Sequence, residues 1–150
     1  MAVFTPETAV LDPALIDAYR ATDYVLFVAP RTEITLNIGL PNAALDRELD
    51  RRGAATAVVV TAYNPRSIVL SETENRARHA ALTALLDERG HTYALGEGRD
   101  PKGHWKAELE CVVFGIPLET GLEIARRFEQ NAIVFVQKGG VPELAYPDGA

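Results

Sequence analysis

The chain has 150 residues, of which 47% are hydrophobic and 24% charged, and this is the composition of one globular domain with its own core. Its formal net charge of -6 argues against nucleic acid as a partner, because such binding needs a basic face that displaces counterions. Cys111 is the only cysteine, which excludes a disulfide framework and a thiolate metal cluster; its apolar neighbours predict a buried strand.

The N-terminal sequence has no basic segment followed by an apolar run, so no signal peptide is expected. No apolar stretch approaches the roughly 20 residues that a membrane span requires. We therefore expect a cytoplasmic protein that makes no membrane contact.

The first third of the chain predicts two short helices around a β-hairpin. Asp12 can cap a helix that begins at Pro13, since proline is tolerated in the first turn. Asn42 can cap a second helix, and Gly53 supplies its C-terminal stop. Between the helices, two apolar segments flank a polar turn. The elements expected here are helices at 13–21 and 43–52 and strands at 24–29 and 34–39.

The remaining sequence predicts the order β-α-β-β-α-β. Ser71 and Glu74 form a capping box for a helix that continues to Arg89 and stops at Gly90. The other elements expected are strands at 54–62, 91–95, 107–115 and 132–136, a helix after Pro117, and a small edge strand within 141–147. This order predicts a single α+β domain over 1–150 with a ferredoxin-like split β-α-β-β-α-β core at about 54–136. The N-terminal helix, hairpin and short helix would extend or cover its sheet.

In a ferredoxin-like sheet, three polar loops of this chain would meet at the end where the first core strand finishes. They are residues 63–71, 96–107 and 129–132, and we call this end of the sheet the polar rim. The loop at 96–107 contains Gly-x-Gly but no third glycine, so it predicts a flexible hairpin and not a dinucleotide site.

Two polar residues of the capped helix fall on its core-facing side. Leu82 marks that side, and steps of four and three residues back from it reach Arg78 and Asn75. A polar side chain at such a position needs a partner. Either Arg78 pairs with a carboxylate such as Glu74 or Glu108 and closes the core, or Asn75 and Arg78 form the floor of a pocket for an anionic or amide-bearing ligand.

The other polar residues of the rim each allow a structural and a functional interpretation. Asn64 precedes proline and can simply form the turn, while Arg66 can be solvated. Trp105 can cover a pocket or plug the hairpin base. Further candidates are Glu97 and Asp100 in the hairpin loop, as solvated residues or site groups, and Gln130 and Asn131, as a helix stop or as amide contacts.

Candidate acid–base groups are few. Glu108 and Glu110 share a strand face with Val112, and Glu108 is the better candidate for a general base because it lies nearer the rim. His79 follows Arg78 and could serve as an acid or base, although an exposed helical histidine is commoner. The three histidines show no metal-ligand spacing, so neither a metal nor another cofactor is predicted.

The segments TAYNPRS, LSETENRAR, GEGRDPKGHW and FEQNAIVFV together resemble the bacterial family known as domain of unknown function 3293 (DUF3293), over roughly residues 19–136. Tyr63 stands where the family usually has tryptophan, Glu129 where glycine is common, and the strand after Trp105 lacks the family's serine. The resemblance implies a small cytoplasmic bacterial protein and no particular activity. The matched positions, all placed at the polar rim, are Asn64, Pro65, Asn75, Gly96, Gly98, Asp100, Trp105, Gln130 and Asn131.

Three functions remain open from the sequence. The first is binding of a small anionic or nucleotide-like ligand at the rim by Asn64, Arg66, Asn75, Arg78, Asp100, Trp105, Gln130 and Asn131. The second is an enzyme, a hydrolase or isomerase of a small polar metabolite, with Glu108, Glu97 or His79 as acid or base. The third is a structural or partner-binding protein whose rim is a scaffold and whose sheet edge supports a homodimer.

Overall fold

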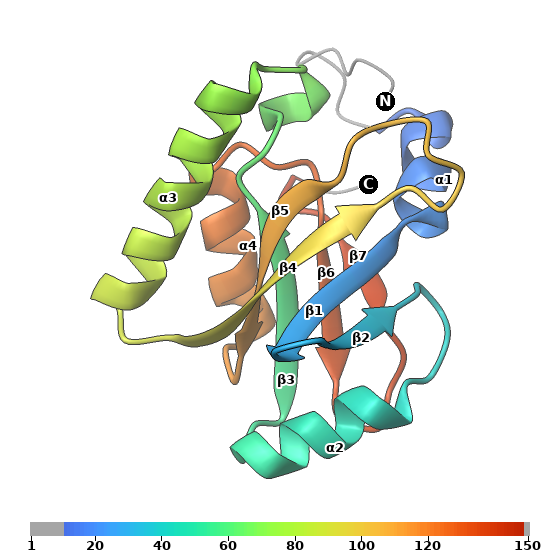
Figure 1. Cartoon of the computed structure of the whole chain (residues 1–150), viewed down its shortest axis with the longest axis vertical. Helices are drawn as coiled ribbons and strands as arrows, with labels where there is room; N and C mark the ends of the chain where they lie inside the picture. Colours follow the sequence, from blue (N-terminus) through green and yellow to red (C-terminus); the bar gives the residue numbers. More distant parts are fainter. Residues whose placement is uncertain (1–10, 149–150) are drawn as a thin grey trace.

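The computed structural model describes residues 11–148, which form one seven-stranded antiparallel sheet with helices on both faces (Figure 1). Its strand order is β2-β1-β4-β5-β3-β6-β7. The strands are β1 (Asp23–Ala29), β2 (Thr32–Leu36), β3 (Thr56–Thr61), β4 (Thr92–Arg99), β5 (Glu108–Phe114), β6 (Ile133–Gln137) and β7 (Glu143–Ala145). The helices are α1 (Pro13–Ala21), α2 (Ala43–Arg52), α3 (Glu72–Glu88) and α4 (Leu118–Arg127), with a 3₁₀ turn η1 (Pro65–Ser67).

Local capping signals set the ends of the helices, as the sequence predicts. The Asp12 carboxylate accepts a hydrogen bond from the Ala14 amide at 2.8 Å and starts α1. Ser71 and Glu74 form the expected capping box at the start of α3. Gly53 ends α2 in the left-handed conformation, with φ 66°. Each signal acts within about one turn of its helix, which is why the sequence alone locates these ends.

Both faces of the sheet are buried, because residues of β3 and β5 alternate between two apolar clusters. On one face Val58, Cys111 and Val113 pack under α3 and α4. On the other, Val59 and Val112 pack with the side chains of α2. Figure 1 shows α1 and α2 at opposite ends of the molecule. The second face therefore has a helix at each end, and the site described below lies at the α1 end.

The α+β class is confirmed, and β4, β5, β3 and β6 are neighbours in that order. The expected hairpin loop at 96–107 is wrong in its first part, since β4 continues to Arg99 and the loop is 100–107. Gly96 and Gly98 are strand residues that pair with Leu26 and Tyr24 of β1. An added Cβ on Gly96 would lie 2.2 Å from the Val25 carbonyl oxygen, so glycine permits close strand pairing there and does not mark a flexible loop.

The second hairpin strand is also shorter than expected: β2 ends at Leu36 instead of continuing to residue 39. Within residues 11–148 no helix is long and apolar enough to cross a membrane.

Candidate functional site

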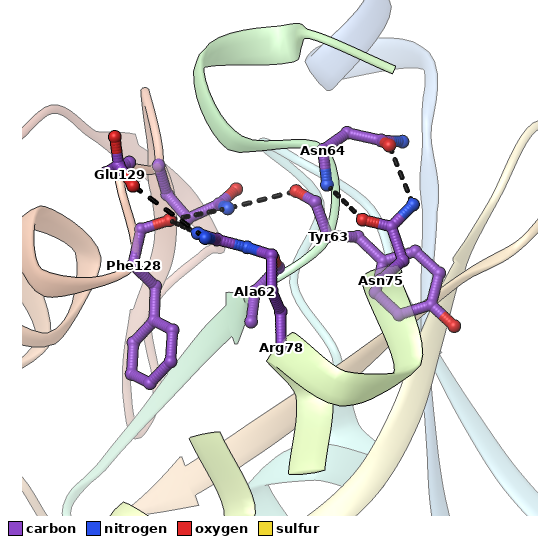
Figure 2. Close-up of polar contacts among 8 residues, drawn as sticks. Ala62, Tyr63, Asn64, Asn75, Arg78, Phe128 and Glu129 are labelled. Carbon is purple, nitrogen blue, oxygen red and sulfur yellow. Dashed lines mark hydrogen bonds and ion pairs between the residues drawn. The ribbon is translucent and has the colours of Figure 1, made fainter. Parts of the chain in front are cut away.

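A pair of asparagines organises the corner between β3 and α3. The Asn64 amide N–H donates to Asn75 Oδ1 at 2.8 Å, and Asn75 Nδ2 donates back to Asn64 Oδ1 at 2.8 Å (Figure 2). Asn64 Oδ1 also accepts from the Leu70 amide at 3.0 Å, and Asn64 Nδ2 donates to Glu108 Oε1 at 2.7 Å. The buried Asn75 therefore holds the turn in place, and Asn64 connects that turn to β5.

Arg78 binds two backbone carbonyls, not a ligand pocket. Its Nε donates to the Ala62 oxygen at 2.7 Å and its Nη2 to the Phe128 oxygen at 2.5 Å (Figure 2). Its ionic partner is Glu129, at 3.7 Å, so the expected pairing with Glu74 or Glu108 is wrong. The reason is tertiary: the end of α4 lies beside the end of β3 and presents its last carbonyls to the guanidinium. Arg78 thus joins two elements of the core.

Several residues at this corner adopt the left-handed backbone conformation that favours glycine. Their φ angles are 46° at Asn64, 55° at Arg66, 59° at Ser67 and 57° at Glu129. The two segments contact each other, because the Arg66 amide donates to the Glu129 oxygen at 2.8 Å. Left-handed non-glycine residues are energetically unfavourable and cluster at functional sites. Here the conformation brings the buried Ser67 into the wall of a cavity.

That cavity lies on the sheet face opposite α3, beneath α1, and has a volume of about 60 Å³. This is room for on the order of four water-sized molecules or a small organic group. Its wall combines residues from α1, both halves of the sheet and the loops at the polar rim. The lining residues are Ala18, Tyr19, Thr22, Tyr24, Val59, Thr61, Tyr63, Asn64, Ser67, Gly98, Trp105, Glu108, Glu110, Gln130, Ala132, Ile133, Val134 and Leu144. We call it the α1 pocket.

Two carboxyl groups stand side by side in the α1 pocket, on one face of β5. Glu110 is only 4% exposed, and its Oε1 is buried with no hydrogen-bond partner among the described residues. Burial raises the pKa of Glu110 well above its ordinary value, and the neighbouring Glu108 and Glu97 raise it further. Burial also raises the pKa of Glu108, against the opposing effect of the Asn64 hydrogen bond. Of these two carboxyl groups, Glu110 therefore holds its proton more firmly.

Aromatic side chains form much of the remaining wall: Tyr19, Tyr24, Tyr63 and Trp105. The Tyr24 hydroxyl donates to the Tyr19 carbonyl oxygen at 2.7 Å, and the Tyr63 hydroxyl donates to Glu72 at 2.8 Å. Burial raises the pKa of Tyr63 to about 12, with the Glu72 hydrogen bond as the second cause. These phenols stay neutral at physiological pH and contribute apolar rings to the wall.

The structure gathers some of the predicted rim residues at the α1 pocket and separates the others. Asn64, Trp105 and Gln130 line it, as does Glu108. Gln130 donates to the Tyr63 and Phe128 carbonyls at 3.0 and 3.2 Å.

The other five predicted ligand contacts do not line the α1 pocket. Asn75 and Arg78 hold the corner described above. Arg66 pairs with Asp148 at 3.3 Å, and Asn131 donates to Ser67 Oγ at 3.1 Å. The Asp100 carboxylate accepts from the backbone amides of residues 102 and 104, which lower its pKa and close the hairpin turn. The helix stop expected at Asn131 comes two residues earlier, at the left-handed Glu129.

The three candidate acid–base residues are not brought together. Glu97 pairs with Leu109 across the sheet, between Gly96 and Gly98, so strand alternation sends its side chain to the face opposite Glu108. There it accepts from Arg99 Nε at 2.7 Å. His79 lies on α3; burial and the nearby Arg76 lower its pKa, and its Nδ1 is buried without a partner among the described residues. Only Glu108 lies at the pocket.

Sequence reasoning missed Glu110, Tyr19, Tyr24 and Ser67 as pocket residues. The signal for Glu110 was present: a glutamate two residues from Glu108, within an otherwise apolar strand, shares its face. No local signal marks the tyrosines or Ser67, because α1 and β1 reach the pocket only through tertiary packing. In residues 11–148 no group of three or more His, Cys, Asp or Glu side chains could hold a metal ion.

Fold and site together define a class: an α+β protein whose antiparallel sheet carries two helices on one face and a carboxyl-lined pocket on the other. Residues 60–133 match a family described as "Protein of unknown function (DUF3293)". This segment is therefore a DUF3293-like domain, and it contains the motifs on which the resemblance rested except the last three residues of FEQNAIVFV. The match is shorter than the expected 19–136, since it leaves out α1, β1, β2 and α2. No curated protein and no solved structure matches the chain.

Proposed function

We propose that the chain binds a small molecule in the α1 pocket. The observation that carries the proposal is the Glu110 carboxyl, which lines the cavity with one oxygen buried and unpartnered among the described residues. Leaving a buried polar group without a hydrogen bond costs roughly 1–3 kcal/mol, and a ligand that donates to it removes this cost. The strained turn at 64–67 supports the same site, since it holds Asn64 and Ser67 in the wall.

The pocket's chemistry does not support the anionic or nucleotide-like ligand that the sequence suggested. Arg66 and Arg78, the predicted cationic contacts, engage Asp148 and the two backbone carbonyls instead. An anion beside Glu108 and Glu110 would oppose ionisation of both carboxyls, and no lysine or arginine among the described lining residues would attract it. A ligand that donates hydrogen bonds fits this wall, and the proposed binding site moves from the rim itself to the sheet face below it.

A ligand screen on the full chain by thermal shift and Trp105 fluorescence tests the proposal. Trp105 is the single tryptophan and lines the pocket, so its emission reports binding there. A ligand at 100 times its dissociation constant should add about 2.7 kcal/mol of stability. Ala132→Phe, which fills the pocket, should abolish the response, with Ala18→Phe as a second filling variant. Ala81→Phe, at an exposed position on α3, is the matched control and should respond as wild type. Equal responses in all four proteins would refute the site.

A second candidate function is acid–base catalysis in the same pocket, favoured by the raised pKa of both carboxyl groups. Glu110 would donate a proton, and Glu108 would be the base, on a small polar metabolite that undergoes hydrolysis or isomerisation. Among ligands found by the screen, turnover that Glu110→Gln removes while binding persists would establish catalysis; unchanged ligand after prolonged incubation would leave the protein as a binding module.

We also propose that β3, α3, β4, β5, α4 and β6 form a ferredoxin-like core. Their order along the chain and the neighbour order β4-β5-β3-β6 support this assignment. In this arrangement β1 and β2 extend the sheet, α1 covers the pocket, and α2 packs on the same face at the other end.

A further inference from the structure

We propose that the α1 pocket selects an organic cation, with an ammonium group beside Glu108 and Glu110 and its alkyl substituents against the aromatic wall. This inference rests on the proposed binding function and names its ligand class. Three features of the pocket support it: the two carboxyl groups, the hydrogen-bond donors that are already engaged, and the aromatic side chains.

Among the described residues, the wall carries two carboxyl groups and no cationic side chain. Glu108 and Glu110 are two residues apart on β5 and line the same cavity. None of the lining residues in the described part of the chain is lysine or arginine. A bound ammonium would favour the ionised form of both groups and displace the Glu110 proton, and the low local dielectric would strengthen its attraction to the resulting carboxylates.

Three side-chain donors of the wall are already used within the protein. Asn64 Nδ2 donates to Glu108, Gln130 Nε2 to two carbonyls, and the Thr61 hydroxyl to the Leu109 oxygen at 2.6 Å. By contrast, Glu110 Oε1 has no partner among residues 11–148. These three donors are therefore not available to a ligand, whereas the carboxyl oxygens can accept, so a ligand with N–H groups or a positive charge fits better than one with carboxylate or phosphate oxygens.

The aromatic side chains provide the second half of cation recognition. Tyr19, Tyr24, Tyr63 and Trp105 come from α1, β1, the end of β3 and the hairpin loop, and converge on one small cavity. Aromatic rings attract cations through their negative faces, and pockets built from several rings recognise alkylated ammonium groups. The combination of rings with two carboxyls favours an alkylammonium over an inorganic cation, which prefers a shell of oxygen ligands.

Gly98 keeps space beside these carboxyls. A Cβ at this position would lie 3.4 Å from Glu110 Oε2 and 3.6 Å from the Thr22 methyl carbon. The glycine thus leaves the Glu110 carboxyl free of a neighbouring side chain from β4, on the side where a ligand group can approach.

The test compares two molecules of nearly the same shape that differ in charge. The full chain is titrated with tert-butylammonium chloride and with tert-butanol at constant ionic strength, with tetramethylammonium as a quaternary probe and acetate as an anion. Binding is followed by Trp105 fluorescence and by amide chemical shifts. The cations should saturate the pocket, with an affinity at least roughly ten-fold above that of tert-butanol. Acetate should not bind.

Variants assign the effect to the carboxyls. Glu110→Gln should weaken tert-butylammonium roughly ten-fold or more and leave tert-butanol nearly unchanged. Glu108→Gln should have the same direction of effect, whereas Glu143→Gln, at an exposed strand position, should change neither. Calorimetry in buffers with different ionisation heats should detect proton release on cation binding and none with tert-butanol. The groups that couple to this proton are Glu108 on β5, Glu97 on β4 and Tyr24 on β1.

Three outcomes would overturn the inference: no saturable binding by either cation, equal affinity for tert-butanol or acetate, or wild-type cation affinity in Glu110→Gln. Binding of neutral or anionic molecules that Ala132→Phe abolishes would retain the proposed function and remove only the cation preference. A pocket that binds no molecule of any class would remove both.

Discussion

Replacing Glu110 by glutamine should make the folded protein more stable at neutral pH. The substitution keeps the size of the side chain and one carbonyl oxygen but removes the ionisable group. In the folded protein the buried Glu110 carboxyl has a pKa well above its ordinary value of 4.5, chiefly because of desolvation. In the unfolded chain the same group is solvated and loses its proton near the ordinary value.

The sign of the pH dependence follows from this difference. Above the unfolded-state pKa, the folded protein holds a proton that the unfolded chain has released. The free energy of unfolding therefore falls as pH rises. The contribution of Glu110 is fully present below the unfolded-state pKa and is lost as pH rises through the folded-state pKa. One proton sets the maximum slope at about 1.4 kcal/mol per pH unit. Glu110→Gln has no such slope.

Urea unfolding of wild type and variant at several values between about pH 5 and pH 8 measures this effect. The stability difference should be smallest at low pH and should grow steadily in favour of Glu110→Gln. Glu108 is present in both proteins, so most of its own titration cancels in the difference. Glu143→Gln serves as the control and should remain parallel to wild type. A difference that stays constant across the range would show that Glu110 keeps the same protonation in both states, and would refute the reasoning.

Two further predictions concern the corner and the sheet. Arg78→Ala should destabilise the protein by about 2–3 kcal/mol because two buried carbonyls lose a charged donor. Arg76→Ala, on the exposed side of α3, is the control and should cost less than about 1 kcal/mol. Equal effects of the two variants in chemical denaturation would show that Arg78 does not stabilise the contact between β3 and α4. Gly96→Ala should cost about 3 kcal/mol or more, since its Cβ would overlap a carbonyl of β1, while Gly98→Ala meets only movable side-chain atoms and should cost less. If the two glycine variants have the same midpoint in urea, the close pairing of β4 with β1 is not what requires glycine.

Much of the fold could be predicted from short-range sequence signals. Asp12, Asn42 and Ser71 each cap a helix through a hydrogen bond to an amide two or three residues away. The α+β class follows from the spacing of these helices and of the apolar strands between them. Such interactions join residues that are close together in the chain, so they can be predicted without knowledge of the tertiary structure.

The position of the site depended on long-range packing. Helical periodicity correctly placed Asn75 and Arg78 on the inner side of α3, but that side faces the sheet away from the pocket. Strand alternation assigned Glu108 and Glu110 to one common face, yet nothing local indicated that α1 covers it. The sequence thus identified the right end of the sheet but did not indicate which face of the sheet carries the pocket.

What the sequence determined by itself is therefore the set of elements, their capped ends and the presence of unusual polar residues at one end. Tertiary structure alone decided which of those residues hold the fold and which line a cavity. Arg78 joins β3 to α4 because the Phe128 carbonyl at the end of α4 lies within hydrogen-bond distance of it. Glu110 is buried, with Oε1 lacking a partner among residues 11–148, because a helix more than 80 residues earlier in the chain covers it. The burial of a side chain and the geometry of its partners depend on how distant segments pack, so a short stretch of sequence does not determine them.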